Sequence, residues 1–409
     1  MTKLKIAITI NYIAVGGSQT FAFSLARGLA NLGHEVFIYD FNLPFFIESL
    51  ENLKSPLLLN SSNIKLFKFK IPFPEYIYRH VIKIRLLEIF ITWFLNKVRV
   101  KKFSNFVREN KIQLVSSHLM GADTLSGLAL KSFPEVVHCV SMHGSYEGYP
   151  QVAKKKLREL IFSRVNGIVY LTQRNLEFLK ALKYVNSKVD IIKIYNGYLF
   201  EIFNNSNSKV SRLDLGISED AFVFIQVARG AKNKGWEESI EAFIMASKST
   251  KFEIFLLLIG GGEYLEELKV KYQNYSRIIF YGYAGNPIPF IEIANVGLLP
   301  TYYSGESLPN SVIEYLYLGK PVLASGNGEI AEMIGANSES PAGYALPLSF
   351  TNGVNIEELY EKMILYIEDK IVYYKHQINA IVQSKKFDMD ICANSYSSFF
   401  LKLYHQIQK

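Results

Sequence analysis

The chain has 409 residues, of which 49% are hydrophobic and 20% charged, and its formal net charge at pH 7 is +8. This length exceeds what one hydrophobic core usually supports, so we expect two domains. The composition is too apolar for a disordered chain and too evenly interrupted by charges for a polytopic membrane protein. Cys139 and Cys392 lie far apart and form no C-x-x-C pair, which favours neither a disulfide framework nor a zinc site.

The first half of the chain alternates strand and helix patterns. Residues 4–10, LKIAITI, predict a strand, Gly16 and Gly17 predict a turn, and residues 18–34 carry apolar side chains at helical spacing. The glycines and helix pattern stand where a signal peptide would need its small-residue cleavage site, so we interpret the N-terminus as a first strand and expect a cytoplasmic protein. Further strands are predicted at 35–40, 112–118, 135–144, 167–172 and 189–197.

Much of the positive charge falls in residues 79–111, where basic residues are interleaved with Ile, Leu, Phe and Trp93. The apolar run 86–95 is interrupted by Glu88 and is shorter than the ~20 residues that span a bilayer. Two interpretations stay open: a basic amphipathic helix on an anionic membrane surface, or helices that bury an apolar side in the first domain. No nucleic-acid motif accompanies the charge, so we expect no nucleic-acid partner. The basic residues are Arg79, Lys83, Arg85, Lys97, Arg99, Lys101, Lys102, Arg108 and Lys111.

A polar stretch at 204–220 is the best linker candidate, and the alternation restarts after it. Strands are predicted at 221–230, 252–262, 277–283, 296–300 and 321–325, with helices at 235–248, 263–273, 289–294 and after Glu306. A last helix pattern occupies 387–408. We therefore predict two doubly wound, Rossmann-like α/β domains at 1–200 and 201–385, with a C-terminal helix at 386–409.

Ligands of doubly wound sheets bind beyond the carboxyl ends of the strands, and with two such domains we expect the site in the cleft between them. In the stretch 302–325, the carboxylates Glu306 and Glu314 stand on either side of Pro309, which suits the first turn of a helix. The start of that helix predicts an anion site, and flanking carboxylates suit the hydroxyl groups of a sugar. The alternative is a loop carboxylate and a solvated helix glutamate.

Two cations follow the strand at 221–230. Arg229 and Lys234 lie ahead of Gly235 and the next helix, where they would neutralise a diphosphate. The alternative is a pair of surface residues in a turn. Elsewhere, His118 ends a strand and is either a cleft or a structural residue, and His138 is interpreted as structural. Asp388 and Asp390 match the D-x-D pattern of metal-dependent transferases, but they open the C-terminal helix away from the strand ends.

In five ordered motifs the sequence resembles the retaining family 4 glycosyltransferases of the GT-B fold, and the resemblance covers nearly the whole chain. Residues 306–314 match the family's E-x(7)-E motif and 229–235 its R-x(4)-K-G segment. Residues 194–197 match its N-G turn, 16–36 its opening glycine loop and helix, and 141–146 its strand-end histidine. Ser307 replaces a usual glycine, and Tyr315 and Tyr317 stand where alanines are common, so we expect a pocket of altered shape.

The resemblance implies a role for each matching residue. Arg229 and Lys234 would bind the donor diphosphate, Glu314 the ribose and Glu306 the transferred sugar. The amides near Ser307 and Leu308 would meet the phosphate, and His143 would lie by the donor sugar. Gly16 and Gly17 would let the first loop approach the ligands closely. The last helix would cross back onto the first domain.

The resemblance also implies a reaction. A hexose or N-acetylhexosamine would move from a nucleotide sugar, for which we expect a UDP-sugar, to a lipid-linked glycan or cell-surface polysaccharide. The anomeric configuration would be kept, by attack on the face that the diphosphate leaves; double displacement through a carboxylate is the alternative. No metal or other cofactor is expected. A nucleotide-sugar epimerase and a catalytically silent partner of another transferase remain as alternative functions.

Overall fold

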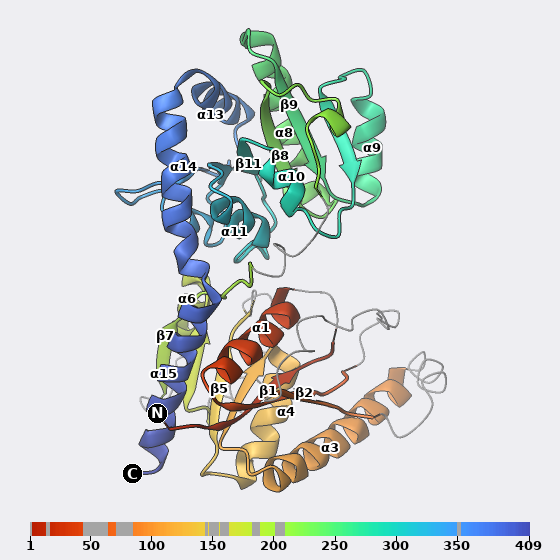
Figure 1. Cartoon of the computed structure of the whole chain (residues 1–409). Coiled ribbons are helices and arrows are strands. Elements are labelled where there is room, and N and C mark those ends of the chain that lie inside the picture. Colours follow the sequence, from red (N-terminus) through yellow and green to blue (C-terminus); the bar gives the residue numbers. More distant parts are fainter. Residues whose placement is uncertain are drawn as a thin grey trace. The chain divides into compact units, whose positions relative to one another are not determined.

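The computed structural model describes residues 2–13, 17–43, 64–70, 85–143, 146, 155, 163–181, 189–200, 209–349 and 353–409. The chain divides into two compact units (Figure 1). The first unit comprises Met1–Leu199 together with Asp388–Lys409, and the second comprises Phe200–Phe387. Among the described residues, no helix is both long and apolar enough to cross a membrane.

A seven-stranded parallel sheet forms the centre of the first unit, in the order β3-β2-β1-β4-β5-β6-β7. Strands β4 and β5 are buried along their whole length, as expected where helices cover both faces of a parallel sheet. The strands are β1 (Lys5–Ile10), β2 (Glu35–Asp40), β3 (Ile64–Lys68), β4 (Leu114–His118), β5 (Val137–Ser141), β6 (Gly167–Tyr170) and β7 (Asp190–Lys193).

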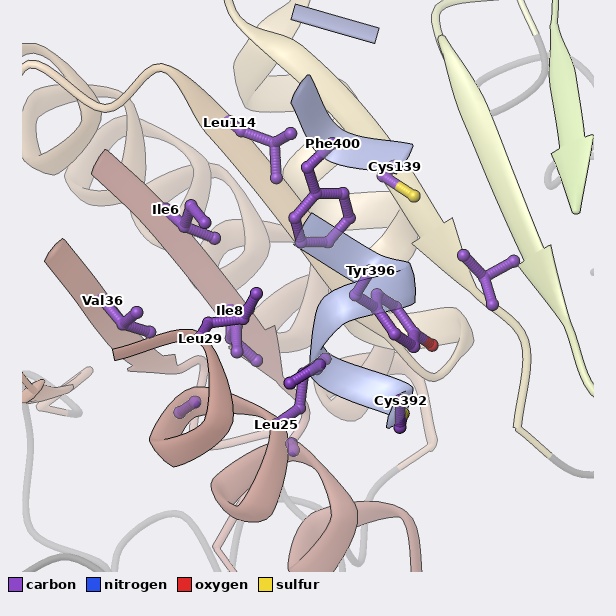
Figure 2. Packing of buried hydrophobic residues seen from close by; sticks show 14 of the residues in the cluster. Ile6, Ile8, Leu25, Leu29, Val36, Leu114, Cys139, Cys392, Tyr396 and Phe400 are labelled. Atoms are coloured by element: carbon purple, nitrogen blue, oxygen red, sulfur yellow. The ribbon is translucent and has the colours of Figure 1, made fainter. Parts of the chain in front are cut away.

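The helices of the first unit include the C-terminal one, α15. They are α1 (Gly17–Asn31), α3 (Arg85–Glu109), α4 (Met120–Ala129), α6 (Gln173–Ala181) and α15 (Met389–Ile407), with a 3-10 turn η1 (Leu130–Ser132). Figure 2 shows Tyr396 and Phe400 of α15 packed into the same core as Ile8 and Leu114 of the sheet. A Cβ on Gly28 of α1 would lie 2.6 Å from the Ala393 Cβ, so the glycine lets α1 and α15 approach closely.

The second unit is built on a six-stranded parallel sheet, in the order β10-β9-β8-β11-β12-β13. Its strands are β8 (Phe222–Val227), β9 (Ile254–Ile259), β10 (Ile278–Gly282), β11 (Val296–Leu299), β12 (Val322–Ser325) and β13 (Gly343–Leu346). In this order the neighbours β8 and β11 lie on either side of the point where strand succession reverses. In doubly wound sheets that point is where ligands bind.

Helices flank this second sheet. They are α8 (Trp236–Ser249), α9 (Glu263–Lys271), α10 (Ile288–Glu292), α11 (Asn310–Tyr317), α12 (Ile330–Met333), α13 (Ile356–Glu368) and α14 (Lys370–Ser384), with 3-10 turns η3 (Leu213–Leu215), η4 (Lys232–Lys234) and η5 (Lys385–Phe387). The predicted pair of doubly wound α/β folds, with the last helix on the first sheet, is confirmed.

Candidate functional site at the strand ends

The turn between β8 and α8 brings Lys234 to the end of the neighbouring strand β11. Gly235 has φ of +75°, and a Cβ at this residue would lie 2.3 Å from the Pro300 carbonyl oxygen. Both facts favour glycine, since other residues rarely adopt this φ and none would fit the gap. The amide of Tyr302 also donates to the Asn233 carbonyl, at 2.9 Å. The turn that carries Lys234 is therefore fixed against the loop that carries Glu306.

Lys234 and Glu306 form a buried ion pair. Lys234 Nζ lies 2.5 Å from Glu306 Oε2, and each side chain is only 9% exposed. The Thr301 hydroxyl donates to the same carboxylate oxygen, at 3.0 Å. A lysine ammonium has three N–H donors, and Glu306 accepts from one of them. The two residues that the sequence places 72 positions apart thus meet at one point.

Arg229 and Tyr303 complete this cluster. Arg229 is exposed, and its Cζ lies 5.9 Å from the centre of the Tyr303 ring. The Lys234 Nζ lies 4.9 Å from the same ring centre. Both distances fall in the range of cation–π attraction. Tyr303 was not among the residues predicted from sequence, although it stands only three residues before Glu306.

Helix α11 begins after the Glu306 loop. It starts at Asn310, and Pro309 occupies the capping position just before it instead of the first turn, with no side chain bonded to the helix start. The first N–H groups of a helix lack partners inside the helix, so this end suits an anion. Glu314 lies in the second turn and is only 6% exposed. The alternative of a solvated helix glutamate at position 314 is therefore wrong.

The last residue of β12 and residues just after that strand hold the Glu306 loop in place. The Glu329 amide donates to the Ser307 carbonyl, at 3.1 Å, and the Asn327 side chain donates to the Tyr303 carbonyl, at 2.8 Å. The Ser325 hydroxyl donates to the Thr301 carbonyl, at 2.5 Å. Ser325, Asn327 and Glu329 were missed by sequence reasoning because nothing in their own pattern indicates that they support a distant loop.

Tyr315 has a different role from the one expected. We predicted that it alters the pocket, but its side chain is fully buried and packs against the sheet, where a Cβ on Gly297 would lie 2.2 Å from its ring. Its hydroxyl accepts from the Val227 amide, at 2.8 Å. The absence of a side chain at Gly297 makes the room for this ring. Tyr317 stacks on Phe200, with the ring centres 3.6 Å apart.

The glycine turn at 260–262, after β9, adjoins the Arg229 turn. The Gly230 amide donates to the Gly261 carbonyl, at 2.9 Å. A Cβ on Gly260 would lie 2.2 Å from the Ala228 carbonyl oxygen. The two strand-end turns therefore pack backbone to backbone, and the glycines serve this contact.

A second cluster lies at the strand ends of the first unit. Strand β4 ends at His118, and His143 follows the end of β5; the two rings form a hydrogen bond of 2.8 Å between His118 Nδ1 and His143 Nε2. The other nitrogen of His143 lies 3.5 Å from the Asn196 side-chain amide. Phe21 of α1 packs against the His143 ring, with centres 5.2 Å apart. His118 is thus a fully buried partner of His143.

Burial keeps these two histidines neutral. It lowers the pKa of His143 to about 3. Burial, with a smaller contribution from His143, also holds the pKa of His118 well below its ordinary value. At neutral pH the pair therefore offers hydrogen-bonding groups without a net charge, in contrast to the charged cluster of the second unit.

A buried carboxyl group near these strand ends was missed. Asp123 in the first turn of α4 is fully buried and accepts from the Tyr146 hydroxyl, at 2.7 Å. Burial raises the pKa of Asp123 to about 7. Of the two glycines in the predicted loop, Gly16 lies outside the described residues and Gly17 is the first residue of α1.

The remaining sequence candidates have structural roles. Asp388 caps α15, where it accepts from the amides of Asp390 and Ile391. His138 is fully buried and pairs with the Ser117 hydroxyl, at 3.0 Å. Arg99, counted in the basic segment, is also fully buried. Within the described part of the chain, no group of three or more His, Cys, Asp or Glu side chains is placed to hold a metal ion.

Comparisons with known proteins agree with this architecture. The profile of Glycosyl transferases group 1 matches residues 207–386, and that of Glycosyltransferase Family 4 matches residues 15–198. The N-acetyl-alpha-D-glucosaminyl L-malate synthase of Bacillus anthracis is 22% identical over 86% of each chain. The alpha-monoglucosyldiacylglycerol synthase of Acholeplasma laidlawii is 25% identical over 69% of this chain and 68% of its own.

A solved structure shares the fold. The Anabaena protein HepE, in complex with UDP and glucose, superimposes with a TM-score of 0.71 at 17% identity, covering 98% of this chain and all of its own. Two parallel-sheet units of this kind make up the GT-B fold. The chain belongs to the family 4 glycosyltransferases.

Proposed function

We propose that this protein is a retaining glycosyltransferase that moves a hexose or N-acetylhexosamine from a UDP-sugar to a lipid-linked glycan or cell-surface polysaccharide, on the cytoplasmic side of the membrane. The observation that carries the proposal is the cluster of Arg229, Lys234 and Glu306 beside the start of α11. It combines cations for a diphosphate with a carboxylate for sugar hydroxyls at one set of strand ends.

The donor binds mainly in the second unit. Arg229 and Lys234 bind the diphosphate and stabilise the charge that grows on it as the sugar leaves, which is where fixed electrostatics lower a barrier most. The amides near Ser307 and Leu308, with the start of α11, bind phosphate oxygens. The buried carboxylate of Glu314 accepts from the ribose hydroxyls.

Glu306 has two functions in this proposal. Its Oε2 contacts Lys234 and Thr301, so we assign Oε1 to the hydroxyls of the transferred sugar. His143 contributes a neutral ring beside that sugar, and Asn196, 3.5 Å from its Nδ1, is the contact that a sugar hydroxyl would replace. Gly16 and Gly17 would admit the ligands to the first loop.

The acceptor attacks the anomeric carbon from the face that the diphosphate leaves, and the departing phosphate takes the acceptor's proton. The new glycosidic bond replaces the bond to phosphate, so UDP is released and the configuration is kept. The UDP and glucose bound to HepE and the lipid product in the name of the Acholeplasma relative support the donor and acceptor classes. We propose that no metal or other cofactor takes part.

Hydrolysis of the donor tests the reaction without a known acceptor. UDP-glucose and UDP-N-acetylglucosamine, with GDP-, ADP- and CMP-sugars for comparison, are incubated with the protein, and nucleotide release is measured with and without EDTA. Proton NMR at early times identifies the anomer formed. We expect UDP release that EDTA does not change, with the α-anomer appearing first. First appearance of the β-anomer would contradict retention, and loss of activity in EDTA would contradict metal independence.

A further inference from the structure

A groove runs along helices α3 and α4 of the first unit. None of the residues that line it is assigned to the donor. Its volume is about 880 Å³. Ile89, Trp93 and Val100 of α3 form one wall, and Leu125 and Leu128 of α4 form the other. The walls are therefore mainly apolar, although the groove opens at the protein surface.

The first half of α3 exposes large apolar side chains beside this groove. Ile89 is 61% exposed, Phe90 60% and Trp93 53%. The second half of the helix behaves differently, because Phe103 and Phe106 are buried in the core of the unit. The second half of α3 thus buries an apolar side in the first unit, as one of the two interpretations of the basic segment expected. A contiguous exposed apolar surface on a water-exposed protein indicates a binding surface.

The charge on the helix is arranged along the same groove. Ile89, Trp93, Lys97 and Lys101 recur every four residues, so they form one stripe on α3 that passes from apolar to basic. All four line the groove. The Lys97 Nζ lies 3.8 Å from the centre of the Trp93 ring.

No acidic residue occurs between residues 89 and 108. Arg99 adds nothing to the surface charge, because its guanidinium is buried against the carbonyls of Phe41 and Asn42. Lys97 and Lys101, which line the groove, are both exposed.

We propose that the groove holds one hydrocarbon chain of an anionic lipid in a bilayer, with Lys97 and Lys101 binding the headgroup phosphate. Along the groove, apolar side chains are followed by an aromatic ring and then by two cations. This order matches that of an anionic lipid, whose hydrocarbon chain is followed by the interfacial region and then by the headgroup phosphate. A second copy of the chain would bring the same positive stripe, and like charges across an interface are unfavourable. The inference does not depend on the identity of the sugar donor.

The two tryptophans of the chain make a direct test possible. Trp93 lines the groove, whereas Trp236 is fully buried in the second unit. The protein is mixed with phosphatidylcholine vesicles that contain or lack phosphatidylglycerol. In a third, otherwise identical set of vesicles, the acyl chains of the phosphatidylglycerol carry bromine. We expect co-sedimentation with the anionic vesicles only, and quenching of Trp93 by the brominated chains. Co-sedimentation without quenching, or no binding, would overturn the proposal.

Two sets of variants distinguish binding of a hydrocarbon chain in the groove from attraction by surface charge. Thr124→Phe and Leu128→Phe each fill the groove from α4 without altering a charge, and both should abolish the quenching; Thr124→Val, which adds no bulk, should not. Lys97→Gln with Lys101→Gln should weaken binding to anionic vesicles about 30-fold, whereas Lys248→Gln with Lys251→Gln, on exposed lysines of the second unit, should leave it unchanged. Quenching that persists in both filled variants would contradict the proposal.

Two further measurements test whether the variants fold and whether copies of the chain associate. The circular dichroism spectrum of each variant reports on folding, and it should equal that of the unmodified protein. Light scattering reports association between copies. A dimer that Trp93→Glu abolishes would overturn the proposal in favour of a protein interface at the groove.

Discussion

The strand ends of the two sheets carry opposite kinds of chemistry. In the second unit, an exposed arginine and the lysine of a buried lysine–glutamate pair lie against the ring of Tyr303. In the first unit, His118 and His143 form a neutral, buried pair against Phe21. The same doubly wound frame thus presents charge at one set of strand ends and uncharged polar groups at the other.

Under the proposed function, the charged strand ends of the second unit suit a diphosphate, and the neutral strand ends of the first unit suit the hydroxyls of a sugar. A diphosphate needs fixed cations, and those are costly to bury unless a carboxylate pairs with them. A sugar carries no charge, and its hydroxyls are matched by neutral donors and acceptors. Changes in the second unit should therefore affect donor binding and turnover. Changes in the first unit should affect the pH dependence of stability.

The largest expected effect follows from breaking the buried ion pair. Lys234→Met leaves the Glu306 carboxylate buried without its cation, which should lower the free energy of unfolding by about 3–5 kcal/mol. The double variant Lys234→Met with Glu306→Gln should recover most of this stability but not the activity. Urea denaturation and donor turnover measure the two effects separately. Equal stabilities of the single and double variants would show that the pair is not coupled.

Arg229→Ala should reduce turnover strongly while leaving the fold intact, because the side chain is exposed. We expect a loss of about 10²–10³ in kcat/KM for a UDP-sugar, the usual consequence of removing a group that stabilises developing charge. Arg277→Ala, at an exposed arginine paired with Glu253, is the matched control and should retain full activity. Wild-type turnover in Arg229→Ala would remove this residue from the proposed site.

A smaller effect is expected at Glu314. Glu314→Gln keeps the shape of the side chain but weakens its hydrogen bonds to the ribose hydroxyls, so the Kd for UDP should rise about 10-fold. Calorimetry with UDP and with 2′-deoxy-UDP measures this effect. The variant should bind both ligands alike, whereas the unmodified protein should prefer UDP. An unchanged preference in the variant would contradict the assignment of Glu314 to the ribose.

A pH-dependent effect is expected from the neutral histidines of the first unit. The folded-state pKa of His143 is lowered to about 3 from its ordinary value of 6.5, so the unfolded chain binds more protons. Stability is then fully present above about pH 6.5 and falls as pH decreases towards 3. His143→Phe should reduce this slope by about 1.4 kcal/mol per pH unit. Denaturation measured between pH 4.5 and 7 tests this expectation, with His405→Gln, at an exposed histidine, as the control variant. Identical slopes for His143→Phe and the unmodified protein would contradict it.

The positions of Lys234 and Glu306 at the strand ends of the second unit were predictable because both residues stand at fixed spacings near glycine and proline. Gly235 marks the turn of Lys234, and Pro309 marks the start of α11. Sequence reasoning could not place Tyr303 between the cations, since that depends on how two loops pack. It also assigned Tyr315 to the pocket. The space that this ring occupies beside Gly297 belongs to a strand of the sheet, and the sequence around Tyr315 does not reveal it.

Three further differences between the sequence-based predictions and the structure also depend on tertiary contacts. Strand β3 was not predicted, and its side chains after Ile64 are exposed at the sheet edge, where the apolar run typical of a buried parallel strand is not required. Arg99 resembles its neighbouring surface lysines in sequence, but two backbone carbonyls after β2 bind it. Asp123 gave no signal at all, because one carboxylate in an apolar helix looks like an ordinary surface residue.

Calorimetric titration of the protein with UDP, GDP, ADP and CMP is the most direct test of the proposed donor site. We expect that UDP binds most tightly, that EDTA does not change its affinity, and that Arg229→Ala and Glu314→Gln each weaken it. UDP binding unaffected by either substitution, or no binding of any of the four nucleotides, would contradict the assignment of the charged strand ends to a nucleotide-sugar donor.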